Sequence, residues 1–183
     1  MPGSPSRCQE VREPSMEIAI RHERAPDAAA IRAVTEAAFR NAPHASGTEP
    51  SIVESLRSAG ALTLSLVAEK DGAVVGHVAL SPVSISDRTP RWFGLGPISV
   101  VPEWQRRGIG SQLMREALQL LRERGAAGCV LLGDPAYYGR FGFRAEPGLV
   151  LPDVPPELFQ ALAFGSSLPR GVVTYHEAFE AKS

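Results

Sequence analysis

The stretch that decides the fold is residues 105–111, Gln-Arg-Arg-Gly-Ile-Gly-Ser. It follows an apolar run at residues 97–101 that reads as a strand, and it opens a pattern typical of an amphipathic helix. Gly108 and Gly110 permit a tight turn with no Cβ in the way, so the first N–H groups of the helix can converge on an anion. The sequence therefore predicts a cradle for a diphosphate, with arginine charge beside it.

Two other phosphate-binding loops are excluded by the residues present. A P-loop needs a lysine and then serine or threonine after its second glycine, and its glycines are spaced more widely. A dinucleotide fingerprint needs a third glycine three residues after the second, where this chain has Leu113. A plain glycine-rich turn with solvated arginines is the simpler interpretation that stays open.

Length and charge limit the classes of protein to consider. The 183 residues, 44% of them hydrophobic, suffice for one core. We expect a single domain at residues 16–183 after a flexible N-terminal extension at residues 1–15, with Met16 as an alternative start. A net charge of −1, from 19 basic and 20 acidic residues, points to small-molecule partners, with no nucleic acid or membrane expected.

Cysteine and histidine usage bears on location and metals. Cys8 and Cys129 fit reduced thiols in the cytoplasm better than a disulfide framework. The four histidines lack zinc-ligand spacing, so no metal site is predicted. The N-terminal residues do not have the apolar core of a secretory signal, and no apolar run is long enough for a membrane span.

The expected elements run strand, helix, helix, three strands, helix, strand, helix, strand. Strands are expected at residues 18–22, 62–69, 74–80, 92–101, 129–132 and 171–175, with a main-sheet strand beginning at Phe143, and helices at residues 27–39, 49–58, 108–125, 136–140 and 157–164. Asp71-Gly72 predicts a two-residue hairpin turn, and Gly94 and Gly96 predict a bulge. This order gives an α/β chain of mixed α+β type, with a mixed, mostly antiparallel sheet covered by helices, and not a doubly wound fold.

A second motif at residues 132–143 reads Leu-Gly-Asp-Pro-Ala-Tyr-Tyr-Gly-Arg-Phe-Gly-Phe. With the glycine turn and the element order, it resembles the GNAT superfamily of acetyl-CoA-dependent N-acetyltransferases, over about residues 17–180. Together with residues 172–179, it is similar to the YhbS-type subgroup. The resemblance implies a three-layer fold with helices on both faces of the sheet. One departure is Asp134-Pro135, where the wider superfamily carries an asparagine.

The resemblance also implies a function and a site. Acetyl-CoA would donate an acetyl group directly to a primary amine of a small molecule or protein. The bulged strand would face the thioester, main-chain N–H groups of the glycine turn would hold the pyrophosphate, and Tyr138 would protonate the departing thiolate. Tyr137 is expected as core or as a wall of the substrate site. The expected acetyl-CoA contacts are Ile98, Ser99, Val100, Arg106, Arg107, Gly108, Ile109, Gly110 and Ser111.

The proton acceptor and the partners stay open at this point. An amine with a pKa of about 10 is protonated near neutral pH, so a base must remove a proton. Glu49, His77 and water are the main candidates, with Asp134 and His176 behind them. The alternative function is a non-catalytic acyl-CoA-binding sensor or scaffold. The resemblance also makes a homodimer reasonable.

Overall fold

The centre of the protein is a six-stranded sheet in the order β1-β2-β3-β5-β6-β8. The computed structural model describes residues 17–43 and 45–180, so the predicted extension at residues 1–15 lies outside it. The strands are β1 (Ala19–His22), β2 (Leu64–Lys70), β3 (Ala73–Pro82), β5 (Trp92–Val100), β6 (Gly128–Leu132) and β8 (Phe159–Ala163). All neighbours are antiparallel except β5 and β6, which confirms the mixed, mostly antiparallel sheet.

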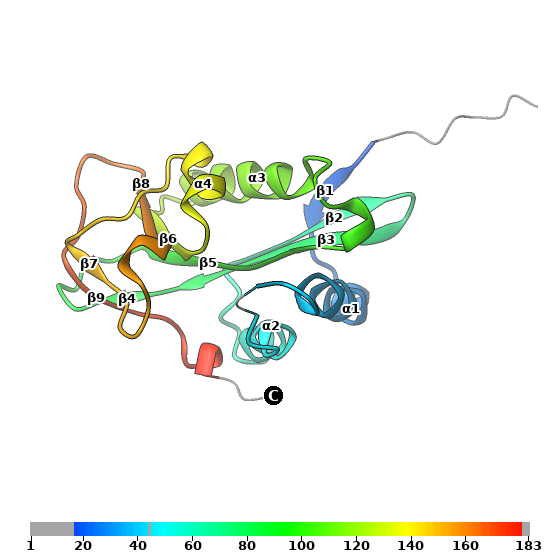
Figure 1. Ribbon diagram of the computed structural model, residues 1–183, viewed down its shortest axis with the longest axis horizontal. Coiled ribbons are helices and arrows are strands. Elements are labelled where there is room, and N and C mark those ends of the chain that lie inside the picture. Colours follow the sequence, from blue (N-terminus) through cyan, green and yellow to red (C-terminus); the bar gives the residue numbers. More distant parts are fainter. Residues whose placement is uncertain (1–16, 44, 181–183) are drawn as a thin grey trace, which may run out of the picture.

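Helices cover both faces of this sheet (Figure 1). One face carries α1 (Ala28–Phe39) and α2 (Glu49–Ser58), and the other carries α3 (Ile109–Glu123) and α4 (Pro135–Tyr138). Short 3-10 helices occupy Ala25–Asp27, Pro102–Trp104, Gly139–Phe141, Pro156–Leu158 and Glu177–Glu180. The three predicted layers are therefore confirmed. No helix in the described part of the chain is long and apolar enough to cross a membrane.

The main core lies between α3 and the sheet. Helix α3 buries one apolar stripe and exposes its charged residues, as its sequence periodicity predicts. The buried residues of that stripe are Ile109, Leu113, Met114, Ala117, Leu118 and Leu121. A smaller cluster on the opposite face joins Ile31 of α1 and Val53 of α2 to β2 and β3. The start of α3 is therefore anchored to the sheet by packing along the whole helix.

The hairpin between β2 and β3 turns at the predicted pair of residues. Lys70 pairs with Ala73, and Asp71 and Gly72 between them have φ of 49° and 82°. Positive φ at both central residues is what a two-residue turn of the favoured hand requires. The Asp-Gly prediction is confirmed.

A bulge interrupts the pairing of β3 with β5. The register shifts between Val78 and Leu80, where Gly96 and Pro97 of β5 together oppose Ala79. Gly96 has φ of 142°, a conformation that favours glycine. The predicted bulge is therefore confirmed at Gly96, in the middle of the strand expected to face the thioester.

The predicted helix at residues 157–164 is wrong, because this segment forms β8. The strand pairs antiparallel with β6, and it buries Phe159 and Ala161 at alternate positions. Gln160 is also buried, and its amide donates a hydrogen bond of 2.9 Å to the carbonyl of Gly133. Pairing with β6 decides the conformation of a short run whose own pattern is ambiguous.

The strand predicted from Phe143 is also wrong. Phe143 is buried, but only an isolated bridge between Arg144 and Ala161 forms there, and β8 takes the place beside β6. The predicted strand at residues 171–175 is confirmed as β9 (Gly171–Thr174). It lies between β4 (Ser84–Ile85) and β7 (Leu149–Val150) in a separate three-stranded sheet.

Candidate active site

The two central parallel strands separate partway along their length. The pairing of β5 with β6 runs from Trp92–Gly94 on one strand to Gly128–Val130 on the other. Past Gly94, β5 continues to Val100 against β3 alone. One edge of β5 therefore opens onto a gap beside the end of β6.

Main-chain groups of β5 point into this gap. Val101 N–H donates to the carbonyl of Val75 on the β3 side at 3.0 Å, and Ser99 pairs with β3. Because alternate residues of an antiparallel strand send their main-chain groups to the same neighbour, Ile98 and Val100 direct theirs to the open edge. Two N–H donors, those of Ile98 and Val100, are thus aimed at the gap.

Ser99 differs from its two neighbours. Its main chain faces β3, and its buried hydroxyl lies 3.3 Å from Thr35 Oγ1 on α1. The carbonyl of Val100 accepts a hydrogen bond of 2.9 Å from Gln105 Nε2. Of the three predicted β5 contacts, the structure brings Ile98 and Val100 to the gap and turns Ser99 away from it.

The glycine turn that the sequence predicts as an anion cradle forms the start of α3. Gly108 stands at the N-cap with φ of 84°, and Arg106 is left-handed as well, with φ of 60°. The N–H of Gln112 makes the first intrahelical bond, to the carbonyl of Gly108 at 3.0 Å. The N–H groups of residues 109–111 precede that bond, so they are the free donors that a helix start offers to an anion.

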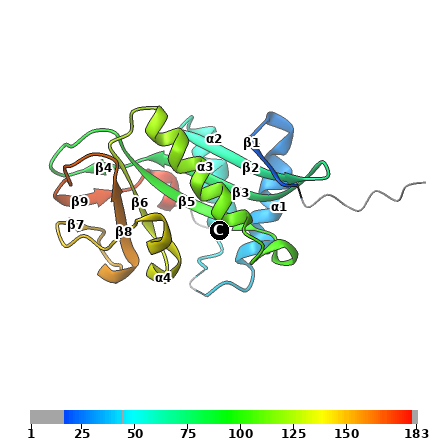
Figure 2. The same ribbon diagram turned by 90° about the horizontal axis from the view of Figure 1, so that it is seen from above.

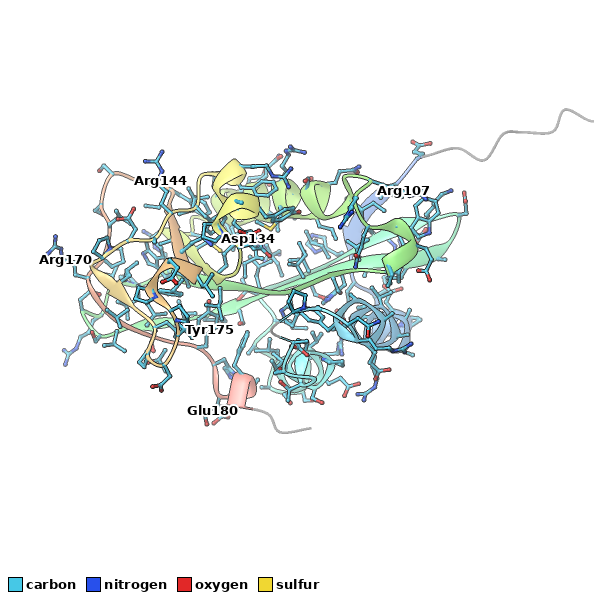
Figure 3. The ribbon with its side chains drawn as sticks, in the orientation of Figure 1. Arg107, Asp134, Arg144, Arg170, Tyr175 and Glu180 are labelled. Carbon is cyan, nitrogen blue, oxygen red and sulfur yellow. The ribbon has the colours of Figure 1, made fainter. Side chains whose placement is uncertain are left out.

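Arg107 is held by an aromatic ring beside the cradle. Its guanidinium lies 4.8 Å from the ring centre of Trp104, over which Lys70 Nζ also lies at 5.1 Å. Figure 3 shows Arg107 and Asp134 on the α3 side of the sheet. Such stacking restrains a flexible arginine, so positive charge is positioned at this end of α3.

Tyr138 lies at the end of β6, beside the gap. Its ring packs so closely on Gly133, the residue after β6, that a Cβ on Gly133 would fall 2.3 Å from a ring carbon. Asp134 caps α4 by accepting a hydrogen bond from the N–H of Ala136 at 2.9 Å. Burial, with Tyr137 and Asp134 adding to it, raises the pKa of Tyr138 to about 12. The phenol therefore keeps its proton at neutral pH and can donate a hydrogen bond.

Tyr137 reaches the cradle, which its sequence position did not reveal. Its hydroxyl would be 2.9 Å from a Cβ placed on Gly110, in the first turn of α3. The guanidinium of Arg140 lies 4.4 Å from the centre of the Tyr137 ring. No local signal distinguishes Tyr137 from a packing aromatic, because the contact depends on how α4 sits against α3.

His77, a predicted base, belongs to a buried network on the other side of β3. Its Nε2 is 2.8 Å from Ser65 Oγ on β2, and the Ser65 hydroxyl donates to Glu23. That donation makes Ser65 an acceptor from Nε2–H, so Nδ1 carries no proton. Burial lowers the pKa of His77 to about 4, and the negative charge of Glu23, which acts to raise this pKa, offsets only part of the shift. His77 is directed toward β2, away from the gap.

Glu49 is the base candidate with an uncommitted atom. It stands in the first turn of α2 and is 8% exposed. Its Oε1 accepts hydrogen bonds from the N–H and hydroxyl of Ser46, at 2.7 and 2.9 Å. Its Oε2 is buried and has no hydrogen-bond partner among residues 17–43 and 45–180. His176 and Asp134 are both engaged in local turns, where each accepts from a main-chain N–H.

An open strand edge, a helix start with N–H groups available to an anion, and a protonated tyrosine after β6 are an arrangement that suits an acyl-transferring enzyme. Residues 29–143 match the model of the acetyltransferase (GNAT) family. The chain is also 42% identical over 125 residues to the uncharacterized N-acetyltransferase YhbS of Escherichia coli, covering 68% of this chain and 72% of that protein. The chain belongs to the acetyltransferase (GNAT) family.

Solved structures agree with this assignment. A GNAT family acetyltransferase from Brucella melitensis in complex with acetyl-CoA is 53% identical, with a TM-score of 0.80 over 90% of this chain and 99% of that one. The structure of Escherichia coli YhbS in complex with CoA gives a TM-score of 0.84 at 36% identity, over 93% of this chain and 96% of that one. The predicted fold class and family are confirmed.

Proposed function

We propose that this protein transfers the acetyl group of acetyl-CoA to a primary amine. The observation that carries the proposal is the pair of N–H groups, of Ile98 and Val100, aimed into the gap between β5 and β6. Fixed main-chain donors of this kind stabilise the oxyanion that forms when an amine attacks a thioester. The similarity to enzymes solved with acetyl-CoA and with CoA supports the choice of donor.

With the thioester placed at Ile98 and Val100, the binding position of the remaining parts of acetyl-CoA can be derived. The diphosphate of acetyl-CoA would bind the N–H groups of residues 106–111, with Arg107 adding charge. The pantetheine arm would then enter the gap and bring its thioester carbonyl to Ile98 and Val100. The enzyme need only hold the two substrates in line, which supplies much of the rate of a bimolecular reaction.

Tyr138 would assist the leaving group. Its raised pKa, about 12, makes it a poor acid toward an ordinary thiolate. A neutral phenol can still donate a hydrogen bond to sulfur as negative charge grows, and it completes the proton transfer late in the reaction. A site that only sensed acyl-CoA would have no use for a donor at this place, so Tyr138 favours an enzyme over a sensor.

The acceptor amine must lose a proton before or during its attack on the thioester. His77 is enclosed by Ser65 and directed toward β2, so Glu49 and water are the groups left for this task. Glu49 is buried, and its Oε2 has no hydrogen-bond partner among the residues that the structure describes.

Location and assembly are part of the same proposal. The buried free thiol of Cys129 supports action in the cytoplasm, where thiols stay reduced. A homodimer is proposed from family resemblance. Trp92 and Phe159 are buried in the core, so neither of these aromatic side chains is available to a dimer interface.

Calorimetric titration tests the proposal. The protein is titrated with acetyl-CoA, CoA, ATP and NAD, beside a Gly108→Asp/Gly110→Asp variant and a control, Gly165→Asp, at which a Cβ would have no described neighbour within 4 Å. We expect selective binding of acetyl-CoA and CoA that the double variant loses and the control keeps. Acetyl transfer to a panel of primary amines is then measured. Equal binding of ATP, or binding of acetyl-CoA without transfer to any amine, contradicts the proposed enzyme.

A further inference from the structure

The buried Oε2 of Glu49 has no hydrogen-bond partner among the described residues, and this is an unfavourable state for a carboxylate. A buried carboxylate is stable only when hydrogen bonds or an opposite charge replace the water it loses. Oε1 meets this condition through Ser46, and Oε2 does not among the residues that the structure describes. The two bonds to Ser46 also fix the carboxylate, so Oε2 is held in one direction before any ligand arrives.

Helix α1 leads across the sheet toward the gap. In its first half Ile31 packs on Val67 of β2 and Ala79 of β3. One turn later Thr35 bonds to Ser99 of β5. The helix therefore runs from β2 toward the open edge of β5, and its last turn extends past the bond to Ser99.

Helix α2 returns beside α1 in the opposite direction. Arg32 of α1 pairs with Glu54, midway along α2, at 2.7 Å, so the two helices lie side by side. Only residues 40–48 separate the end of α1 from the start of α2, which keeps that start near the end of α1, and α2 itself packs against β5. This places Glu49 at the end of the helical layer that reaches the open edge of β5.

The elements on the two faces of the sheet that lie near the gap are found along one side of the molecule. Figure 2 shows α4 and the connection between α1 and α2 along the same side of the molecule, and Figure 1 places them on opposite faces of the sheet. Helix α4, which ends at Tyr138, and helix α2, which begins at Glu49, thus lie on opposite faces of the sheet along this side of the molecule. A donor entering beside Tyr138 leaves the Glu49 face for the acceptor.

We propose that Glu49 Oε2 binds the ammonium group of the acceptor, and that the acceptors are therefore cationic primary amines. This inference rests on the proposed acetyl transfer. An ammonium supplies the opposite charge and the N–H donor that Oε2 requires, and such charge-assisted bonds are short and strong. The same contact holds the nitrogen on the face of β5 from which it attacks the thioester, after one ammonium proton has passed to Oε2 or to water. Amines that carry no positive charge lack this contact and bind poorly.

Glu49→Gln is the first test, because it replaces one carboxylate oxygen by an NH₂ group and keeps the size of the side chain. The amide oxygen keeps the bonds to Ser46, while the NH₂ group replaces the acceptor at Oε2. We expect a thermal midpoint equal to or above that of the wild type, because an uncompensated buried charge is gone. We also expect unchanged acetyl-CoA affinity and a loss of roughly 10²-fold in kcat/KM for cationic amines. Glu54→Gln, exposed on the same helix, is the matched control and leaves kcat/KM unchanged.

A binding probe tests the inference without turnover. The thermal midpoint is measured with methylammonium and with tetramethylammonium, which has the charge but no N–H. Methylammonium should raise the midpoint of the wild type and not that of Glu49→Gln, and tetramethylammonium should raise neither. An equal response in both proteins, or a lower midpoint in Glu49→Gln with the methylammonium response intact, overturns the assignment of Glu49. Absence of acetyl-CoA binding overturns the proposed function instead, and the methylammonium result still decides the role of Glu49.

Discussion

The hydroxyl of Tyr137 lies 2.9 Å from the position that a Cβ on Gly110 would occupy. This contact joins α4 to the first turn of α3, where the anion cradle is built. Glycine at this position leaves room both for the tyrosine and for a phosphate that approaches the main chain closely. The two motifs found in the sequence are thus parts of one surface.

Gly110→Ala tests this surface. The added methyl group pushes the Tyr137 hydroxyl toward the space of the diphosphate, so acetyl-CoA binding should weaken roughly tenfold. Stability should change little, because the end of a side chain can move. Calorimetry on the Gly110→Ala/Tyr137→Phe protein should recover part of the affinity, since the clashing oxygen is absent. Additive losses in the double variant would show that the two residues do not interact.

Tyr138→Phe should lower kcat roughly 10²-fold without changing the affinity for acetyl-CoA. The pKa of Tyr138, about 12, lies far above neutral pH. The ratio of wild-type to variant kcat should therefore stay constant from about pH 6 to pH 9. Steady-state rates across that range check this, with Tyr137→Phe as the neighbouring control. A ratio that changes with pH would mean that another group supplies the proton.

Acid should destabilise the protein through His77. Its pKa falls from 6.5 to about 4 on burial, so the unfolded chain binds a proton in that window while the native state does not. The free energy of unfolding should therefore drop as pH falls from about 6.5 to 4, with His77 contributing about 3 kcal/mol of that loss. Urea titrations at several pH values measure it. His77→Gln should flatten the dependence, whereas replacement of the exposed His22 by Gln should not.

Gly128→Ala should destabilise the fold by roughly 1–3 kcal/mol. A Cβ at Gly128 would lie 2.4 Å from the ring of the buried Trp92, at the start of the paired part of β5 and β6. Gly139→Ala is the control, because its Cβ would have no described neighbour within 4 Å and its backbone is ordinary helix. Chemical denaturation should show Gly139→Ala within about 0.5 kcal/mol of the wild type. Equal stabilities of the two variants would mean that the Trp92 ring moves freely.

The predictions from sequence succeeded where one residue's backbone conformation settled the structure. Asp71, Gly72 and Gly108 all need positive φ, and each marks a turn at the predicted place. The segment at residues 157–164 failed because pairing with β6 outweighs its own weak pattern. Only assembled neighbours could reveal that Gln160 bonds to Gly133.

The candidate site shows the same division. The N–H groups of Ile98 and Val100 could be inferred from the bulged strand and the family resemblance, since main-chain direction follows strand register. The reach of Tyr137 to Gly110 and the uncommitted Oε2 of Glu49 depend on contacts between helices far apart in the chain. Nothing in the spacing of those residues encodes such contacts.

The donors on β5 belong to the peptide backbone, so an alanine scan would pass over them. Replacing Ile98 or Val100 by alanine removes packing atoms but leaves each N–H in place. Proline at either position would delete the donor itself. Under the proposed function, activity on this side of the gap is therefore robust to most side-chain changes along the strand and vulnerable to those that alter the main chain.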